Sequence, residues 1–590
     1  MISRRCNLVL LLVLIAPLAG CQLHRDSARR DRRVVPDSTP SATMAAAECA
    51  FKQAIELEKK CEALCVDYFY QAATQAWPDL EQQFVNGGIP SGRAAEIYHT
   101  ALCKLIQNGQ RHCRFNPASG LQLETSTGPV TIPITYQGFP WRPDEFDQLL
   151  TVNETFSKEL KTWYRCEGLG VATVAIHNRR KCEKFRRQQQ AFAATVILRP
   201  VIREHCPTGQ FEFVFADPLR ISALNMGATS VAIERDPTAP IAYRISQKDR
   251  ANLKEFIHPG ATTENSGLFL MEPYQPGKIP LLFVHGLLSD PFTWANAANE
   301  LRAHPELMAR YQIWGFEYAT GEPFLASAAV LRRQLREVRS QVDPTGSDPA
   351  LDQMVLVGHS MGGLVSKLLV THSGTELWDS VSCRPMEELS MDRETYARLA
   401  DSFYFEPSPS VTRVVFMGTP HRGSPWARRP IGRFGAKLVE EPSSTEDMHR
   451  RLIRDNPNVF SKEFTKRIPT SIDLLRTDSP LLESMDRLPV AERVRLHTIL
   501  GSGYWMLGGG NSDRVVPVSS ARHPSAISEK SVHTKHTDVN EAPEAIEELF
   551  CILKQHWMEN GSADGQVQLN HPTSAVGLDP FTDVDHFLGQ

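Results

Sequence analysis

The sequence has almost no excess of basic over acidic residues or of acidic over basic ones. Its 590 residues carry 64 Lys and Arg against 68 Asp and Glu, which leaves a net charge of -4. A basic surface that binds nucleic acid is therefore not predicted, and we expect no nucleic-acid partner. Because 42% of the residues are hydrophobic and 22% are charged, the composition is ordinary for a globular chain, and the length allows more than one domain.

The apolar run at the start of the chain is too short to cross a bilayer easily. Arg4 and Arg5 precede "NLVLLLVLIAPLAG", and Cys21 follows. The ending "LAGC" resembles the lipobox of bacterial lipoproteins, which implies a signal peptide over residues 1–20 and a lipid on Cys21. A retained membrane helix is the alternative. In such lipoproteins Gln22 implies the outer membrane, so the resemblance predicts a lipid-anchored protein of the bacterial cell envelope that faces the periplasm.

Cysteine is scarce in the C-terminal half. Of the twelve cysteines, eight lie between Cys49 and Cys206. An oxidising compartment and an even count favour disulfides in the N-terminal half, with a connectivity that the sequence does not reveal. Cys61 and Cys65 are one helical turn apart, but no histidine cluster accompanies them at zinc-like spacing, so burial or bridging is favoured over metal binding. We expect no metal and no organic cofactor.

Changes in residue pattern divide the chain into successive regions. Helical spacing comes first, then short β-prone runs, and then apolar strand-like runs that alternate with helical ones. The first two patterns contain no catalytic constellation, so packing or a protein partner is their expected role. The regions are a signal peptide (1–20), a disordered tether (21–44), a helical hairpin region (45–115), a β-rich mixed module (116–270), an α/β domain (271–560) with a lid-like insertion at about 425–490, and a disordered tail (561–590).

The alternation from Lys278 onward predicts the fold class. The apolar runs "PLLFVHG", "QIWGFEY", "MVLVGHS", "TRVVFMGTP" and "RLHTILGS" are separated by helical segments. Such βα units predict an α/β fold, with a mostly parallel central sheet and helices on both faces, preceded by a mixed α+β N-terminal region. Active sites in open sheets of this kind lie beyond the carboxyl ends of the strands.

One serine stands at such a strand end. In "MVLVGHSMGG", Gly358 and Gly362 flank Ser360 two residues to either side. A sharp turn from strand to helix forces the residue at its tip toward left-handed backbone angles, and glycines remove the collisions around it. The pattern therefore predicts that Ser360 is an exposed nucleophile.

The segments "VHGLLSDPFTW", "GHSMGGL", "VVFMGTPHRGS" and "SDRVVPV", in this order, resemble the α/β-hydrolase fold. They are most similar to the lipases and esterases related to GPI inositol-deacylases, over roughly residues 275–556. The resemblance implies that the backbone N-H groups of Leu287 and Met361 stabilise an oxyanion. It also implies that the insertion covers the site.

The same resemblance implies an acid and a histidine after the serine. Asp513, which follows the strand-like "LHTILGS", stands where the acid belongs. His523, His533 and His536 are the candidate bases, and His536 stands where the short last strand of these lipases ends. His533 stays open as the alternative.

His285, His359 and His421 are expected to shape or pack the site rather than to act as its base. A serine hydroxyl becomes a good nucleophile only when an imidazole takes its proton.

The expectation is a membrane-anchored serine hydrolase that cleaves carboxylic esters of lipid or other acyl groups through an acyl-enzyme on Ser360. An amidase with the same residues is one alternative. The other is a catalytically inert envelope scaffold, whose N-terminal half recruits a partner.

Overall fold

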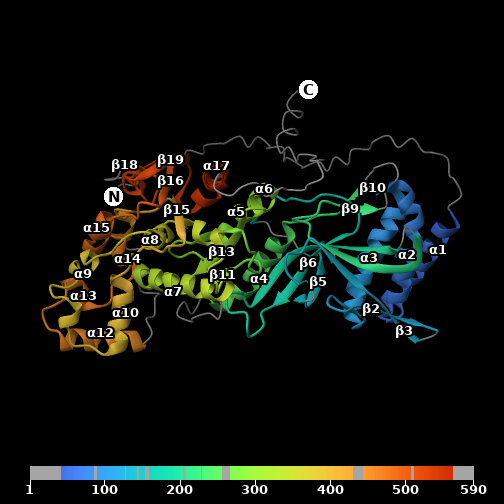
Figure 1. Cartoon of the computed structure of the whole chain (residues 1–590), viewed down its shortest axis with the longest axis horizontal. Helices are drawn as coiled ribbons and strands as arrows, with labels where there is room; N and C mark the ends of the chain where they lie inside the picture. The colour runs from blue at the N-terminus through green and yellow to red at the C-terminus, as the bar shows by residue number, and fades with distance from the viewer. Residues whose placement is uncertain are drawn as a thin grey trace, which may run out of the picture.

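The computed structural model of the chain is elongated, with an N-terminal region at one end and a C-terminal domain from the middle to the other end (Figure 1). We call residues 41–255 the N-terminal region and residues 266–561 the C-terminal domain. The structure describes residues 41–84, 90–126, 128–142, 145–152, 159–203, 206–226, 229–255, 266–428, 443–506 and 510–561. The signal peptide, most of the tether, all but the first residue of the tail and Cys21 lie outside the described residues.

The C-terminal domain is built on a seven-stranded sheet. Five of its six strand pairings are parallel, and only β11 runs antiparallel to its neighbour β13. The strands, in sheet order, are β11 (Gly267–Leu270), β13 (Tyr311–Glu317), β12 (Ile279–Val284), β14 (Met354–His359), β15 (Val411–Met417), β16 (Arg495–Ser502) and β19 (Ala526–His533). The predicted mostly parallel sheet is confirmed, and it begins at Gly267, just ahead of the expected boundary.

Helices cover both faces of this sheet because its central strands are apolar on both sides. All six residues of β12 are buried, as are all six of β14. One face packs against α7 (Phe324–Val342) and α8 (Met361–Lys367). The other face packs against α5 (Ala295–Arg302) and α17 (Pro543–Gly561). This is the α/β arrangement that the alternating pattern predicts.

The start of the N-terminal region contains three helices rather than the expected hairpin of two. They are α1 (Ala42–Lys59), α2 (Cys65–Phe84) and α3 (Gly92–Arg111). Small buried residues such as Ala47, Ala54 and Ala73 let the helices approach closely. The spacing predicted helices correctly, but the turn at residues 60–64, between α1 and α2, divides what we treated as one arm.

The three helices pack against a five-stranded mixed sheet with the order β4-β8-β7-β6-β5. Its strands are β4 (Ile134–Gln137), β5 (Gln148–Thr151), β6 (Val171–Asn178), β7 (Gln189–Arg203) and β8 (Cys206–Ala216). Smaller sheets are formed by β1 (Phe115–Asn116), β2 (Gly120–Thr125) and β3 (Gly128–Ile132), and by β9 (Ala223–Met226) and β10 (Thr229–Ala232). Helix α4 (Ala239–Glu255) begins on the opposite face of the large sheet. The expected mixed α+β character is confirmed.

The N-terminal region docks on the C-terminal domain through the β6-β7 hairpin. Phe185 of this hairpin is buried in the core of the C-terminal domain. Its carbonyl accepts a 2.9 Å hydrogen bond from the backbone N-H of Leu270, in β11. Arg187 forms an ion pair with Glu317 of β13. The hairpin therefore joins the edge of the C-terminal sheet to the N-terminal region.

A group of short helices extends the C-terminal domain at the end remote from the N-terminal region (Figure 1). The described part of the insertion, from residue 443 onward, contains α12 (Ser443–Asp455), α13 (Lys462–Lys466), α14 (Ser471–Leu474) and α15 (Pro480–Arg487). They pack beside α9 (Glu376–Asp379) and α10 (Arg393–Phe403), which follow β14 in the chain. Residues 429–442 of the insertion lie outside the described residues.

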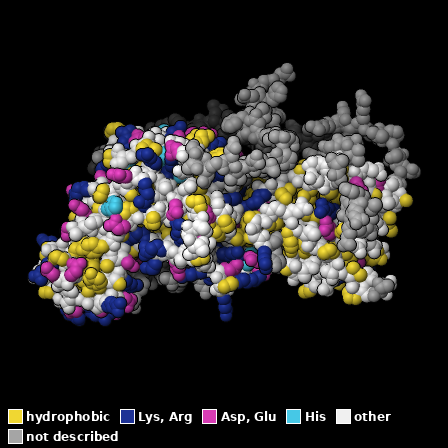
Figure 2. Space-filling model, viewed as in Figure 1, with side chains coloured by type: hydrophobic (Ala, Val, Ile, Leu, Met, Phe, Trp, Pro, Cys, Tyr) yellow, Lys and Arg dark blue, Asp and Glu magenta, His cyan; other side chains and the backbone are white. Residues whose placement is uncertain are grey.

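The nine cysteines whose side chains the structure describes all carry free thiols. Seven of them lie between Cys49 and Cys182, where we expected disulfides, so no bridge forms among these seven. Within the described residues, no helix is both long enough and apolar enough to span a membrane. Acidic and basic side chains are interspersed over the face drawn in Figure 2, in keeping with the small net charge.

Candidate active site

Ser360 lies at the turn between β14 and α8. Its backbone has φ 52° and ψ -124°, which is a left-handed conformation that residues with a Cβ rarely adopt. The backbone N-H of Ser360 donates to the carbonyl of Met417 over 2.8 Å, which ties the turn to the neighbouring strand β15. Such local strain persists only when the surrounding structure over-determines it, and it marks functional sites.

The glycines around Ser360 are required by close approaches of the backbone. A Cβ on Gly358 would lie 2.5 Å from the carbonyl oxygen of Gly362. A Cβ on Gly362 would lie 2.3 Å from the carbonyl oxygen of Val284. Any side chain at either position would push the turn away from β12 and change the direction of the Ser360 hydroxyl.

Three of the predicted site residues form one hydrogen-bonded row. The Ser360 Oγ lies 2.8 Å from His536 Nε2, and His536 Nδ1 lies 2.7 Å from Asp513 Oδ2. A carboxylate only accepts hydrogen bonds, so His536 Nδ1 carries a proton and Nε2 is left to accept the hydroxyl proton. The geometry can therefore transfer a proton from Ser360 to His536 while Asp513 faces the charge that develops on the imidazole.

Asp513 is held in place by the backbone of its own loop. It is 1% exposed, and its Oδ1 accepts hydrogen bonds from the N-H groups of Val515 at 2.9 Å and Val516 at 2.6 Å. Its carbonyl accepts from the backbone N-H of His536 at 2.9 Å. The loop after β16 and the loop after β19 are therefore fixed to each other, and both Asp513 oxygens have partners.

His359 supports His536 from the strand beside Ser360. Its Nε2 donates to the backbone carbonyl of His536 over 2.9 Å. Burial, reinforced by the neighbouring His536, lowers the pKa of His359 to about 3, so this ring is neutral at physiological pH. The sequence led us to treat His359 as a packing residue, whereas its hydrogen bond makes it a positioning residue for His536.

The loop after β12 lies in close contact with Ser360. A Cβ on Gly286 would lie 2.9 Å from the Cβ of Ser360, so Leu287 follows directly on this contact. Leu287 is followed by Leu288, which has a φ of 54°. Met361 is the first residue of α8, where the N-H has no acceptor within its own helix. The two residues whose N-H groups are predicted to stabilise an oxyanion thus lie on either side of Ser360. Leu287 belongs to the loop after β12, and Met361 begins α8.

His285 shapes this loop, as its position in the sequence suggested. Its Nδ1 donates to the carbonyl of Gly286 over 3.1 Å, and its Nε2 accepts from the backbone N-H of Tyr318 over 3.4 Å. The rings of His285 and Tyr318 stack with 4.5 Å between their centres. Burial lowers the pKa of His285 to about 4, which keeps the ring neutral and its two hydrogen bonds fixed.

The other candidate histidines lie elsewhere. His533 is exposed at the end of β19, with its ring centre 5.6 Å from that of Tyr504. His523 is buried against Phe416, at 5.6 Å between ring centres. His421 is 1% exposed and packs between the same Phe416 and His523. Only His536 of these four histidines forms a hydrogen bond to Ser360 in the described part of the chain.

Two residues of the site, Gly418 and Tyr318, were not singled out from the sequence. Gly418, with φ 58°, ends β15 so close to the row that a Cβ there would lie 3.4 Å from His536 Nδ1 and 3.5 Å from Asp513 Oδ2. Tyr318 donates its hydroxyl to the carbonyl of His285 over 2.7 Å. The "MGTP" segment after a predicted strand was a hint for Gly418, whereas Tyr318 depends on a contact between distant segments.

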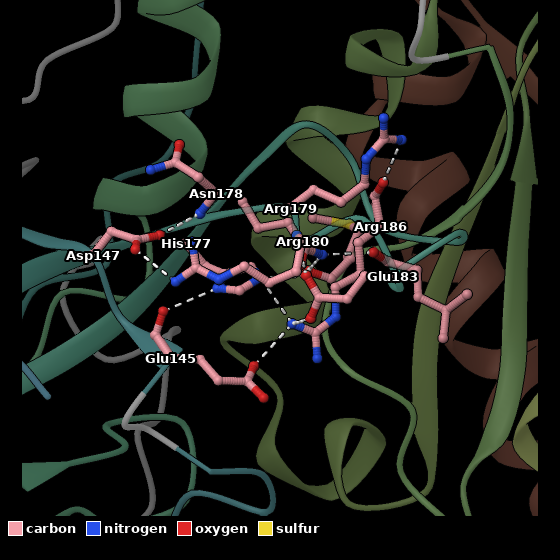
Figure 3. Close-up of polar contacts among 11 residues, drawn as sticks. Glu145, Asp147, His177, Asn178, Arg179, Arg180, Glu183 and Arg186 are labelled. Atoms are coloured by element: carbon pink, nitrogen blue, oxygen red, sulfur yellow. Dashed lines mark hydrogen bonds and ion pairs between the residues drawn. The ribbon is translucent and has the colours of Figure 1, made fainter.

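A second polar cluster lies in the N-terminal region, at the base of the β6-β7 hairpin (Figure 3). Possible ligand atoms of Glu145, His177 and Glu183 lie within 4.8 Å of one another, as metal ligands do. The Arg186 guanidinium already lies among them, 3.0 Å from Glu145 Oε2, 2.5 Å from Glu183 Oε1 and 3.0 Å from His177 Nε2. Because this cation neutralises the carboxylates, the cluster is an ion-pair network that fastens the hairpin.

Comparisons with known proteins gave one family match and a set of similar solved structures. Residues 281–549 match the model of the alpha/beta hydrolase family. No curated relative matches the sequence. The mature lipase BlEst2 of Bacillus licheniformis is 18% identical, with 49% of this chain and 99% of that chain covered and a TM-score of 0.30. Esterase B from Lactobacillus rhamnosis is 14% identical, with 55% and 96% covered and a TM-score of 0.29. Lipase 1 from Pelosinus fermentans is 12% identical, with 48% and 98% covered and a TM-score of 0.30.

The family match and the sheet describe the same part of the chain. The matched residues run from β12 into α17 and include Ser360, Asp513 and His536. The mostly parallel sheet, the left-handed turn at Ser360 and the helices on both faces are the features that the sequence predicted. Over residues 281–549 this chain therefore matches the alpha/beta hydrolase family, and these residues form the mostly parallel sheet described above.

Proposed function

We propose that the protein is a serine hydrolase that cleaves carboxylic esters through an acyl-enzyme on Ser360. The Ser360 Oγ attacks the ester carbonyl carbon while His536 Nε2 takes the hydroxyl proton. The N-H groups of Leu287 and Met361 stabilise the resulting oxyanion. The intermediate then expels the alcohol, which takes the proton from His536. Water attacks the acyl-enzyme by the same route, so the net products are one carboxylic acid and one alcohol.

The hydrogen-bonded row of Ser360, His536 and Asp513 carries this proposal. Its support is that Ser360, 8% exposed as a residue, follows a parallel strand, and that its hydroxyl contacts an imidazole whose other nitrogen is fixed by a buried carboxylate. A serine with only a packing role does not require a left-handed backbone with φ 52°, because such strain costs free energy and is found mainly at functional sites.

A fluorophosphonate probe tests the nucleophile directly. We expect the wild-type protein to be labelled once, at the peptide that contains Ser360, and the Ser360→Ala variant to stay unlabelled. Ser366→Ala is the matched control, because Ser366 is also buried but donates to the carbonyl of Gly362 over 2.8 Å. Labelling of Ser360→Ala at the wild-type rate would overturn the assignment, and complete absence of labelling in both proteins would favour the inert scaffold.

Ester and amide substrates separate the two enzymatic alternatives. We propose esters because the sequence motifs around Ser360 and Asp513 resemble those of lipases and esterases. A pair of substrates with the same acyl group, one with an alcohol and one with an amine as the leaving group, measures the preference. Faster turnover of the amide would replace the esterase by an amidase with the same residues.

The acyl group is proposed to bind beneath the insertion at about 425–490. Ser424 at its start donates to the carbonyl of Val515, in the loop of Asp513, and Ser471 donates to the carbonyl of Glu322. The insertion is therefore fastened to two loops at the carboxyl edge of the sheet. A series of esters of increasing chain length measures the pocket, and identical kcat/KM values along the series would contradict an acyl-binding role.

Membrane anchoring through a lipid on Cys21 is a separate proposal, which rests on the "LAGC" sequence. We expect Cys21→Ser to release the protein from membranes while its activity in solution stays the same. Metabolic labelling with a palmitate analogue should mark the wild type and not the variant. Retention of Cys21→Ser after carbonate washing would contradict lipid attachment.

A further inference from the structure

A cavity lies where the N-terminal region meets the C-terminal domain. Its volume is about 110 Å³, and it is open on one side. The start of β7 and helix α4 contribute one wall, and β11, β12, β13 and the turn before α5 contribute the other. The wall is predominantly apolar, and its larger side chains are Ile241, Phe269, Met271, Phe283, Phe292 and Trp294. Ser360, Leu287 and His536 do not line it, so it is separate from the proposed active site.

Helix α5 of the C-terminal domain is hydrogen-bonded to the N-terminal region, and this fixes one wall of the cavity. The Asn299 amide donates to the carbonyl of Thr162 over 2.9 Å, and its Oδ1 accepts from the Thr238 hydroxyl at 2.9 Å. Three other residues of the helix, at positions 295, 298 and 302, line the cavity. Positions spaced by three and four residues share one helix face, so one face of α5 binds the N-terminal region and another faces the cavity.

Arg302 supplies buried hydrogen-bond donors at this cavity. It is 5% exposed, and its Nε and Nη1 have no hydrogen-bond partner within the described residues. Its Nη2 lies 3.8 Å from Glu272 Oε1, beyond hydrogen-bond distance, and Arg220 shares the same carboxyl group at 3.6 Å. Leaving buried donors of a charged group unpaired costs more than the about 1 to 3 kcal/mol of a neutral group. An acceptor in the cavity would remove that cost.

The other charges at the cavity also favour an anion. Arg187 and Arg244 line it as well. Arg187 is paired with Glu317 and lies over the Phe269 ring, with 4.1 Å from the guanidinium carbon to the ring centre. Burial, reinforced by Arg187, lowers the pKa of Arg244 to about 10, so it stays charged at neutral pH. The cavity thus combines apolar walls with an excess of guanidinium groups.

We propose that this cavity binds a monocarboxylate with a short apolar body. A carboxylate oxygen accepts a hydrogen bond from one of the two unpaired Arg302 donors, Nε or Nη1, which lie on opposite edges of the guanidinium. The hydrocarbon packs against Phe269, Met271 and Phe283. A cavity of about 150 Å³ holds a benzene molecule, so the cavity of about 110 Å³ here encloses part of a short chain, and the rest of the chain extends through its open side. A multiply charged inorganic anion is disfavoured, because apolar walls do not replace its hydration.

Calorimetric titration of the full chain with hexanoate tests the proposal. Hexan-1-ol supplies the same apolar body without the charge, and acetate supplies the charge with almost no body. We expect hexanoate to bind more tightly than either. Replacement of Arg302 by Gln should weaken hexanoate by about ten- to a hundred-fold, the loss of one charged hydrogen bond. The affinity for hexan-1-ol should change little.

Two further variants keep the result decisive. Ala298→Met fills the cavity without altering a charge, so it should abolish hexanoate binding even if Arg302→Gln fails to fold. Arg310→Gln removes an arginine that stacks on Trp557 instead of lining the cavity, and it should bind like the wild type. Equal hexanoate affinity in Ala298→Met and the wild type would place the binding elsewhere and overturn the proposal. No binding to the wild type would also overturn it, leaving water to fill the cavity.

Discussion

The two regions of the molecule use similar polar side chains for different ends. In the C-terminal domain, a carboxylate and a histidine lead to a serine hydroxyl, and the side chain hydrogen-bonded to Asp513 Oδ2 is the imidazole of His536, at 2.7 Å. In the N-terminal region, Glu145, Glu183 and His177 surround the guanidinium of Arg186, which satisfies them. A cluster whose charges are already paired holds structure together, whereas a row that ends in a nucleophile is able to react.

Asp513→Asn breaks the reactive row at its buried end. The amide can donate to His536 Nδ1, which favours the tautomer whose Nε2 carries the proton and no longer accepts from Ser360. We expect ester turnover to fall about 10⁴-fold with little change in KM. Steady-state kinetics check this, and Asp538→Asn, a change at a half-buried carboxylate of η7 (His536–Glu541) outside the row, is the control. Turnover within tenfold of the wild type would mean that another group orients His536.

Arg186→Met tests the ion-pair network of the N-terminal region, the other half of the comparison. It leaves the carboxylates of Glu145 and Glu183 without their cation, and breaking such a mostly buried network costs about 3 to 5 kcal/mol. Thermal unfolding should show this loss while kcat stays unchanged. The control is Arg180→Met, because Arg180 is 51% exposed in its pair with Asp147 and such pairs contribute about 1 kcal/mol at most. A large fall in kcat without loss of stability would give the cluster a role in the reaction.

His359→Phe tests the positioning role of the neutral histidine. The variant keeps an aromatic ring beside Trp294 but removes the 2.9 Å hydrogen bond to the His536 carbonyl. A displacement of the base by about 1 Å costs about 10²-fold in rate, so we expect kcat to fall by up to that factor. His359→Gln, which restores a donor, should recover part of the loss. Equal kinetics of both variants and the wild type would reduce His359 to a packing residue.

Acid should destabilise the two regions unequally. Burial lowers the pKa values of His285 to about 4 and of His359 and His556 to about 3, below the usual value of about 6.5 in the unfolded chain. The unfolded chain therefore takes up these protons first, and stability falls as the pH drops from about 6.5 toward 4, by at most about 1.4 kcal/mol per pH unit for each histidine.

In the N-terminal region the pKa of His99 is shifted in the opposite direction. Contacts with Cys103 and then Glu234 raise the pKa of His99, so it is protonated in both states below about pH 6.5 and adds no acid sensitivity. Calorimetric scans at pH 7 and pH 5 should show a larger shift for the unfolding of the C-terminal domain. An equal or larger shift of the N-terminal region would contradict this difference.

Local sequence patterns predicted the candidate active site better than the contacts between the N-terminal region and the C-terminal domain. The glycines around Ser360 and the loop of Leu287 stand in segments whose own turns require them, so their positions were legible in the sequence. The contact of α5 with the N-terminal region depends on Thr238 and Asn299, which are 61 residues apart and have no local signature. The break between α1 and α2 was missed because the apolar spacing from Phe51 to Ala72 continues across it. The disulfides were predicted from a compartment rather than from distances between cysteines.

The choice between His536 and His533 tests the central claim most directly. His536 lies 2.8 Å from the Ser360 hydroxyl, whereas His533 is exposed at the end of β19 beside Tyr504. The measurement is the ester turnover of His536→Ala beside that of His533→Ala. We predict that His536→Ala loses as much activity as Ser360→Ala, about 10⁶-fold, because the row acts as a unit, while His533→Ala retains wild-type turnover. An inactive His533→Ala beside an active His536→Ala would contradict the account.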